Sequence, residues 1–380
     1  MSKDDIRPED LEKRRDGRNI NPRLGTLSGE GSQQRVKELD GSNPARGLMR
    51  TQPSQSDISA GAPSYYGQPV VKTTVWIWTI PLYFYVGGTA GAASVLGAVV
   101  ELTGGKSLQA LGRRCRWVGA AGDLVSSGLL IYDLGRPERF LNMLRVFRPT
   151  SPMSLGSWIL SGSGALNSLA VLLSRQRGVL GRVGDGAALA GGLLGMPLAG
   201  YTAVLITNTA NPVWQGTHKS LPLFFMSSAL ASAGSLLSLL PHAPQEERVL
   251  RLFSAMGSVA ALGTGVAVQR DASRVEAVGR HLKQGVPGAL WTAARVCTAA
   301  SLALSVWPRQ RPWMKTAGAV LGTAGALMAR FSIFHAGKAS SKDPQATFQA
   351  QRQGLGAAEV TGQALASDGK PFSFPLPVVR

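Results

Sequence analysis

Residues 126–140 read SSGLLIYDLGRPERF, and this stretch decides how the whole chain is interpreted. An apolar run with almost no charge ends at Asp133, and arginines, a second acid and a proline follow within a few residues. Gly135 can end a helix, and Pro137 cannot continue one. We therefore expect a transmembrane helix that leaves the bilayer into an ordered, charged turn. Asp133 would lie at the membrane edge, either as half of an ion pair or as a proton-handling group.

The rest of the chain repeats apolar blocks of the same kind. Hydrophobic residues make up 44% of the 380 residues and charged residues 16%. The apolar residues come in blocks of about 20, the length that crosses a hydrocarbon core. The 46 glycines suit close-packed membrane helices. The sequence predicts an all-α, polytopic transmembrane helix bundle of about eight spans, near residues 75–102, 117–134, 153–173, 187–207, 221–240, 249–268, 290–307 and 316–335.

We expect three parts along the chain. A polar, basic N-terminal tail covers residues 1–71, an eight-helix membrane domain of two packed four-helix bundles covers residues 72–337, and a polar C-terminal tail covers residues 338–380. The composition of the tails indicates disorder or folding on a partner. No cleavable signal peptide is visible. An even number of spans places both tails on one side, and the larger count of Lys and Arg in the loops of the opposite side favours a non-cytoplasmic location for the tails.

The net charge of +18 would suggest nucleic-acid binding in a soluble protein. Here the basic residues lie in the tails and between apolar blocks, so we expect membrane lipid as the partner and no nucleic acid. Two cysteines cannot hold an iron–sulfur cluster. Of four histidines, only His335 falls at the edge of a span, so neither a bis-histidine haem nor a Cys/His metal site is expected.

Four segments resemble the NrfD/polysulfide-reductase family of integral membrane subunits. TTVWIWTIPLYFYVGGTAGAA resembles the opening helix of that family, and IYDLGRPERFLNMLRVFRPTSPMSLGSWIL is similar to its most recognisable segment. YTAVLITNTANPVW and SLPLFFMSSALASAG are similar to its fourth and fifth helices. The resemblance covers about residues 72–345 and leaves out the N-terminal tail.

The resemblance implies a multi-pass subunit of a respiratory oxidoreductase in the bacterial inner membrane. Such a subunit exchanges electrons between a membrane quinone (menaquinone or ubiquinone) and a docked, ferredoxin-like iron–sulfur subunit. That partner exchanges electrons with a larger catalytic subunit, and the membrane subunit carries no redox cofactor of its own. Two alternatives remain open, a structural anchor without a quinone site and a proton-translocating subunit.

Acidic residues in and beside the second span are the first candidate site residues. Asp133 either pairs with Arg136 and fixes the helix exit, or accepts a proton released when quinol is oxidised near the membrane surface. Asp123 lies ten residues earlier, about 15 Å along a helix axis. An acid inside the bilayer is costly without a partner, so Asp123 either continues a proton path from Asp133 or pairs with a residue such as Arg295.

Aromatic and histidine side chains form the second group of candidates. Trp76 and Tyr83 begin the first span as interface anchors, and Tyr83 and Tyr132 can instead donate a hydrogen bond to a quinone carbonyl. The exit of the fourth span carries Trp214 and His218, and the even span count puts this exit at the same face. We expect one pocket there, with His218 as a second proton acceptor.

Basic residues after the second span are candidates for partner docking. Arg139, Arg145 and Arg148 are expected to bind the acidic surface of the iron–sulfur subunit. Arg330 and His335 close the last span, and we expect their side chains to extend outward to the interface.

Overall fold

The structure, a computed structural model, describes residues 19–21, 26–28, 69, 71–103, 105–134, 138, 140–308 and 311–352. They belong to two compact units. The first unit contains β1 (Asn19–Asn21), β2 (Thr26–Ser28) and the segment Thr74–Ile77. The two strands pair antiparallel, with Ile20 opposite Leu27. The remaining described residues form the second unit, which is the helix bundle.

Eight long helices make up the described part of the bundle, and each overlaps one predicted span. The predicted all-α bundle is confirmed. Six of these helices are long and apolar enough to cross a membrane. Of the other two, α9 has only 17 residues, and α4 carries several arginines and aspartates. The helices are α3 (Thr79–Thr103), α4 (Gln109–Asp133), α6 (Pro152–Leu172), α7 (Val179–Thr207), α9 (Leu221–Leu237), α10 (Pro244–Ala272), α12 (Gly285–Val306) and α13 (Pro312–Ser341).

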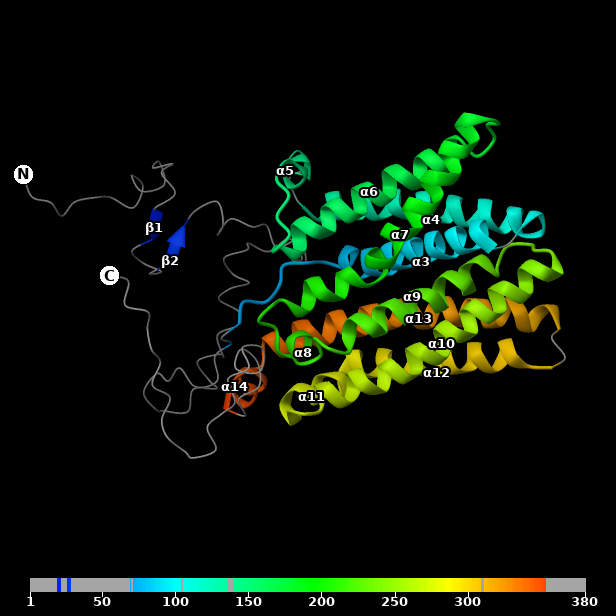
Figure 1. Ribbon diagram of the computed structural model, residues 1–380. Coiled ribbons are helices and arrows are strands. Elements are labelled where there is room, and N and C mark those ends of the chain that lie inside the picture. Colours follow the sequence, from blue (N-terminus) through cyan, green and yellow to red (C-terminus); the bar gives the residue numbers. More distant parts are fainter. Residues whose placement is uncertain are drawn as a thin grey trace, which may run out of the picture. The chain divides into compact units, whose positions relative to one another are not determined.

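Short helices connect the long ones. They are η1 (Lys106–Leu108), α5 (Phe140–Arg145), α8 (Pro212–Gly216), α11 (Glu276–Lys283) and α14 (Pro344–Arg352). The end of the bundle where α3 begins and α13 finishes is called here the near end, and the other is the far end. Figure 1 shows α5, α8, α11 and α14 at the near end. The chain therefore places its longer connections at the end that carries the candidate site.

The long helices pack as two groups. Helices α3, α4, α6 and α7 contact one another, and so do α9, α10, α12 and α13. Helix α3 also contacts α9 and α13, and α7 contacts α9, so α3 lies at the junction of the two groups. Within the first group, glycines permit close approach of α3 and α7: a Cβ on Gly91 of α3 would lie 2.6 Å from the carbonyl oxygen of Gly195 on α7.

The C-terminal boundary differs from the prediction. Helix α13 runs to Ser341 rather than stopping near residue 335, and α14 follows within the predicted polar tail. The apolar pattern ends before the helix does, because a helix that has left the hydrocarbon core can continue with polar residues. The side chain of Asp343 accepts a hydrogen bond from the Gln345 backbone N–H, which caps the first turn of α14.

Candidate functional site at the near end

Asp133 is the last residue of α4 and lies against the first turn of α3. The Thr79 hydroxyl, at the start of α3, donates a hydrogen bond to Asp133 Oδ1 at 3.1 Å. The first backbone N–H groups of α3 have no partner within the helix, so the positive end of the helix dipole faces this carboxylate. The arrangement stabilises a negative charge at the near end.

Two buried hydroxyl groups lie one to two turns deeper. Tyr83 follows Thr79 by one turn on α3 and is 1% exposed. A Cβ on Gly87 would lie 3.7 Å from the Tyr83 ring and 3.3 Å from Ser126 Oγ, so this glycine leaves room between α3 and α4. Neither the Tyr83 hydroxyl nor Ser126 Oγ has a hydrogen-bond partner among the described residues. Buried hydroxyls normally have partners, so these two are open to a ligand or to water.

Asp123 lies deeper still, inside the first group of helices. Its side chain is buried, and Oδ2 accepts hydrogen bonds from Ser163 Oγ and Asn167 Nδ2, both at 2.8 Å. Asn167 Nδ2 also donates to Ser94 Oγ at 2.9 Å, while Asp123 Oδ1 has no partner among the described residues. The alternative pairing with Arg295 is wrong, because Arg295 lies on α12 and donates to Gln269.

Polar residues therefore follow the interface of α3, α4 and α6 from the near end inward. We call this set the polar ladder, and its members are Thr79, Asp133, Tyr83, Ser126, Asp123, Ser163, Asn167 and Ser94. Beyond it, towards the far end, the Arg116 guanidinium pairs with Glu101 at 2.7 Å and with Asp185 at 2.9 Å. Polar side chains thus occur along most of the length of α4.

The structure places the other predicted site residues elsewhere. Trp214 on α8 is fully buried, and its indole N–H donates to the Ile333 carbonyl of α13 at 2.9 Å. His218 Nδ1 lies 2.8 Å from the Gln215 carbonyl oxygen, close to α8. Helix α8 contacts α13 and α11 and also α7, and the Trp214 side chain is bonded to α13. These contacts do not join them to Asp133.

Four further predicted site residues are Tyr132, Trp76, Arg136 and Arg139. Tyr132 is 63% exposed, so its side chain points away from the ladder. Trp76 belongs to the first compact unit and is described with that unit. Arg136 and Arg139 lie outside the described residues. The structure therefore brings Asp133, Tyr83 and Asp123 into one interface.

Arg145 and Arg148 lie on an ordered, exposed segment. Arg145 ends α5, and the Arg148 backbone N–H donates to Ser154 Oγ at 3.0 Å. Ser154 Oγ in turn donates to the Val146 carbonyl, which fixes the segment to the start of α6. The site thus has a fixed cationic surface beside it.

Sequence reasoning predicted Tyr83 but missed the other uncharged members of the ladder, and it misplaced one arginine. Asn167 could have been predicted as a site residue, because an amide side chain inside an apolar span is unusual. Nothing in the sequence around Thr79 indicates its role. Arg330 was expected at the interface, but it is 2% exposed and lies inside the bundle. The error has a simple cause, since α13 continues eleven residues past Arg330.

Comparison with known proteins identifies one family. The family described as polysulphide reductase, NrfD, matches residues 69–340, which include every long helix apart from the last residue of α13. No curated protein matches the chain. Among the described residues, no group of three or more His, Cys, Asp or Glu side chains is placed to hold a metal ion.

Proposed function

The chain belongs to the NrfD family of membrane subunits of oxidoreductase complexes, and on that premise we propose that it binds quinone or quinol at the near end. It exchanges electrons there with a docked iron–sulfur subunit and carries no haem or iron–sulfur cluster itself. The subunit is an integral membrane protein. Its location in the bacterial inner membrane, with both tails on the non-cytoplasmic side, is part of the proposal.

The observation that carries the proposal is that Asp133 lies at the same α3–α4 interface as the buried hydroxyls of Tyr83 and Ser126, which have no hydrogen-bond partner among the described residues. Oxidation of quinol to quinone releases two electrons and two protons. The Asp133 carboxylate, held by Thr79, is placed to accept one proton at the membrane edge. The buried Tyr83 hydroxyl has no partner among the described residues, and a quinone carbonyl would supply an acceptor. The electrons leave to the iron–sulfur partner.

The exposed arginines support the location of that partner. Arg145 and Arg148 lie at the same end of the bundle as Asp133, on a segment fixed to α6. A ferredoxin-like subunit with an acidic face would bind there and would bring its cluster close to the quinone. The larger catalytic subunit would then contact the iron–sulfur subunit.

A second candidate function is proton translocation, and the observation that favours it is Asp123. Its Oδ1 atom is buried without a partner, although Oδ2 accepts two hydrogen bonds. Asp123 would take a proton from Asp133 through Ser126 and would pass it towards Arg116 and the far end. Proton uptake by vesicles during turnover tests this function, and an Asp123→Asn variant that still moves protons would exclude it.

The proposed function is tested by Asp133→Asn in the complete complex. We expect quinol-linked turnover to fall by about a hundredfold, because loss of a positioned proton acceptor typically has an effect of that order or larger. Glu138→Gln is the matched control, since Glu138 is an exposed acid five residues further along the same junction. Equal turnover of both variants and the unaltered complex would leave a purely structural anchor as the better description.

A further inference from the structure

Arg330 is a buried cation without a carboxylate partner. Its Nη2 donates to the Phe225 carbonyl at 2.8 Å, and its guanidinium carbon lies 3.7 Å from the centre of the Phe225 ring. Nε and Nη1 have no hydrogen-bond partner, and no carboxylate of the described residues forms an ion pair with Arg330. Among the described residues, the groups shown to contact the cation are thus a carbonyl oxygen and an aromatic ring.

Burial of the Arg330 guanidinium without a carboxylate partner costs free energy. A charge inside a bilayer-spanning bundle normally pairs with an opposite charge or lines a water-filled space. Arginine cannot escape the cost by losing its proton, because its guanidinium remains protonated in proteins. A negatively charged partner is therefore missing from the polypeptide around Arg330.

Two buried hydroxyl groups face the same place. Tyr85 on α3 lies close to Thr89 and Thr323 and within electrostatic reach of Arg330, although neither threonine meets the geometry of a hydrogen bond with the Tyr85 hydroxyl. The Tyr85 hydroxyl and Thr323 Oγ1 are both buried without a hydrogen-bond partner among the described residues. Thr323 and Arg330 are seven residues apart on α13, about 10 Å and two turns, so they share one face of the helix. The Arg330 guanidinium and the hydroxyls of Tyr85 and Thr323 therefore offer several hydrogen-bond donors to an acceptor.

The surroundings of Arg330 are not filled completely. A Cβ on Gly88 of α3 would make only ordinary contacts, 3.7 Å from Arg330 Nη2, 3.5 Å from the Ala229 methyl carbon and 3.7 Å from the Ala199 carbonyl oxygen. Space for a methyl-sized group therefore exists beside the guanidinium.

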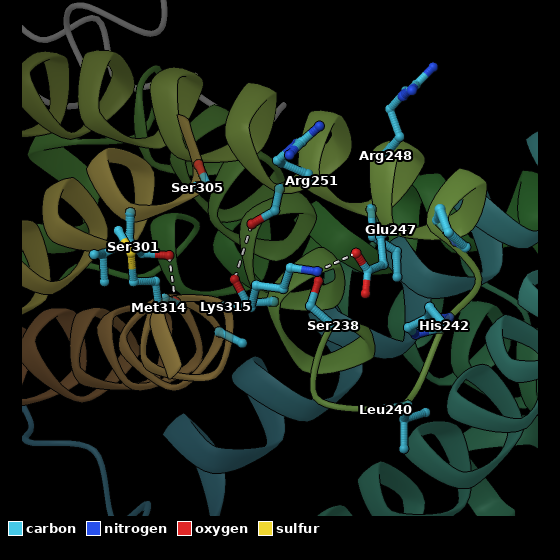
Figure 2. A pocket seen from close by; sticks show the side chains of 17 residues that line it. Ser238, Leu240, His242, Glu247, Arg248, Arg251, Ser301, Ser305, Met314 and Lys315 are labelled. Carbon is cyan, nitrogen blue, oxygen red and sulfur yellow. Dashed lines mark hydrogen bonds and ion pairs between the residues drawn. The ribbon is translucent and has the colours of Figure 1, made fainter. Parts of the chain in front are cut away.

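A cavity lies at the far end of the same group of helices. It measures ≈ 230 Å³ and lies between α9, α10, α12 and α13. Figure 2 shows Lys315 reaching Glu247, while Arg248 and Arg251 extend away from this pair. Neither arginine forms an ion pair with a carboxylate of the described residues, so the mouth of the cavity is positively charged and attracts anions.

The inner wall of the cavity lies next to Gly322. Ser235 and Ser301 line the cavity, and a Cβ on Gly322 would fall 2.2 Å from Ser235 Oγ and 2.8 Å from Ser301 Oγ. Gly322 is the residue before Thr323. The cavity wall therefore reaches the turn of α13 that carries Thr323, and a polar cavity of this size holds several water molecules.

We propose that Arg330, Tyr85 and Thr323 form a buried site for a small monovalent inorganic anion, such as chloride, which enters from the far-end cavity. The anion balances the guanidinium charge and accepts the hydrogen bonds that the two hydroxyls and the arginine do not make within the protein. The site is in the second group of helices and at α3, and it does not depend on quinone binding at Asp133.

The test uses the purified full-length protein in detergent, in sodium chloride or in sodium gluconate of equal ionic strength. Gluconate is too large for a methyl-sized space. We expect the midpoint of thermal unfolding to rise with chloride concentration and to saturate, as mass action requires for a ligand of the folded state. The Tyr85→Phe/Thr323→Val double variant should need about tenfold more chloride, since it lacks two donors to a charged group.

A matched control is the Tyr201→Phe/Thr202→Val double variant in α7, where the Thr202 hydroxyl is likewise buried without a partner. It should keep the full chloride dependence. A crystal grown in sodium bromide should show anomalous scattering beside the Arg330 guanidinium. Equal midpoints of the unaltered protein in chloride and gluconate would overturn the proposal, and so would an unchanged chloride dependence in the Tyr85/Thr323 variant or ordered water without bromide at Arg330.

Discussion

At Asp123 one carboxylate oxygen accepts two hydrogen bonds and the other accepts none. Ser163 and Asn167 hold Oδ2, so the side chain has a fixed orientation, while Oδ1 remains free to bind a proton or a water molecule. The same residue can therefore stabilise the contact of α4 with α6 and take part in proton transfer. The two roles can be separated, because the contact needs only a hydrogen-bond acceptor, whereas proton transfer needs a carboxylate that can be protonated.

The first prediction separates them by comparing Asp123→Leu with Asp123→Asn. Leucine removes the acceptor of the Ser163 hydroxyl and one of the acceptors of the Asn167 amide, and we expect a loss of about 1–3 kcal/mol of unfolding free energy. Asparagine retains a carbonyl acceptor of the same shape, so its loss should be smaller. Unfolding in detergent measures both, and equal loss in the two variants would contradict this account of the hydrogen bonds.

Residues with charge were recognisable from the sequence, and their neighbours were not. Asp123 and Asp133 stand out because an acid in or beside an apolar run needs an explanation. Thr79 and Ser126 are common in helices, and only the packing of α3 on α4 brings them to the acids. Arg330 was expected at the membrane interface because the end of α13 was predicted too early. The helix continues past this residue, so Arg330 lies deeper in the bundle than expected.

At the level of helices, close backbone contact between α3 and α7 depends on glycine. Gly91 and Gly195 face each other, and a Cβ on Gly195 would lie 2.4 Å from the Gly91 carbonyl oxygen. No flexible side chain can yield there, since the obstacle is backbone. Small residues at such positions allow membrane helices to approach closely.

The second prediction compares two glycines of the same helix. Gly195→Ala should force α3 and α7 apart and lower the unfolding free energy by about 1–3 kcal/mol. Gly186→Ala is the control, because nothing lies within 4 Å of the added Cβ and alanine has the higher helix propensity. Thermal unfolding of the two variants should therefore shift in opposite directions, and a neutral Gly195→Ala would refute the close contact.

The third prediction concerns Asp343, which joins α14 to α11. Burial raises the pKa of the Asp343 carboxyl, but hydrogen bonds from His281, Arg280 and the Gln345 N–H outweigh burial and lower the pKa below its usual value. Because the pKa is lower in the folded state, the ionised carboxylate stabilises the fold at any pH above the unfolded-state pKa of about 4. This stabilisation is lost as the pH falls through the folded-state pKa.

Hydrogen exchange of residues 344–352 measures this effect after correction for the intrinsic rate. Protection should stay constant from neutral pH to about 4 and should fall at lower pH. Asp343→Asn should lower protection already at neutral pH and remove most of the acid-dependent step. An unchanged acid profile in that variant would show that another group holds α14.

The number and order of the long helices followed from the apolar blocks, and so did both ends of α6, but several other ends did not. Helix α4 begins eight residues before the predicted span, and α7 does the same, because polar residues continue a helix once it has left the hydrocarbon core. The short helices α5, α8 and α11 have no membrane-length apolar run. Their existence depends on contacts that the local sequence does not show.

Across the whole bundle, the two ends differ in chemistry. The near end carries the Asp133 carboxylate, the ordered segment with Arg145 and Arg148, and the short helices. The far end carries the cationic cavity around Lys315 and the ion pairs of Arg116. This asymmetry is what we expect of a subunit that meets its redox partner at one membrane face only.

The fourth prediction tests that asymmetry by charge reversal. Arg145→Glu/Arg148→Glu should weaken binding of the iron–sulfur subunit roughly tenfold at low salt, and the difference should shrink as ionic strength rises. Arg175→Glu/Arg177→Glu makes the same change in exposed residues of the far-end connection between α6 and α7. Co-purification at several salt concentrations measures both, and stronger loss in the far-end variant would place the partner on the other face.

The most direct measurement of the central claim is the position of the quinone itself. A photoreactive azidoquinone, irradiated in the reduced complex and followed by peptide mass spectrometry, should label the first turns of α3 and the last turns of α4, around Tyr83 and Asp133. Excess unlabelled quinone should suppress the labelling. Displaceable labelling confined to the far end, or no displaceable labelling of this subunit, would contradict quinone binding at the near end.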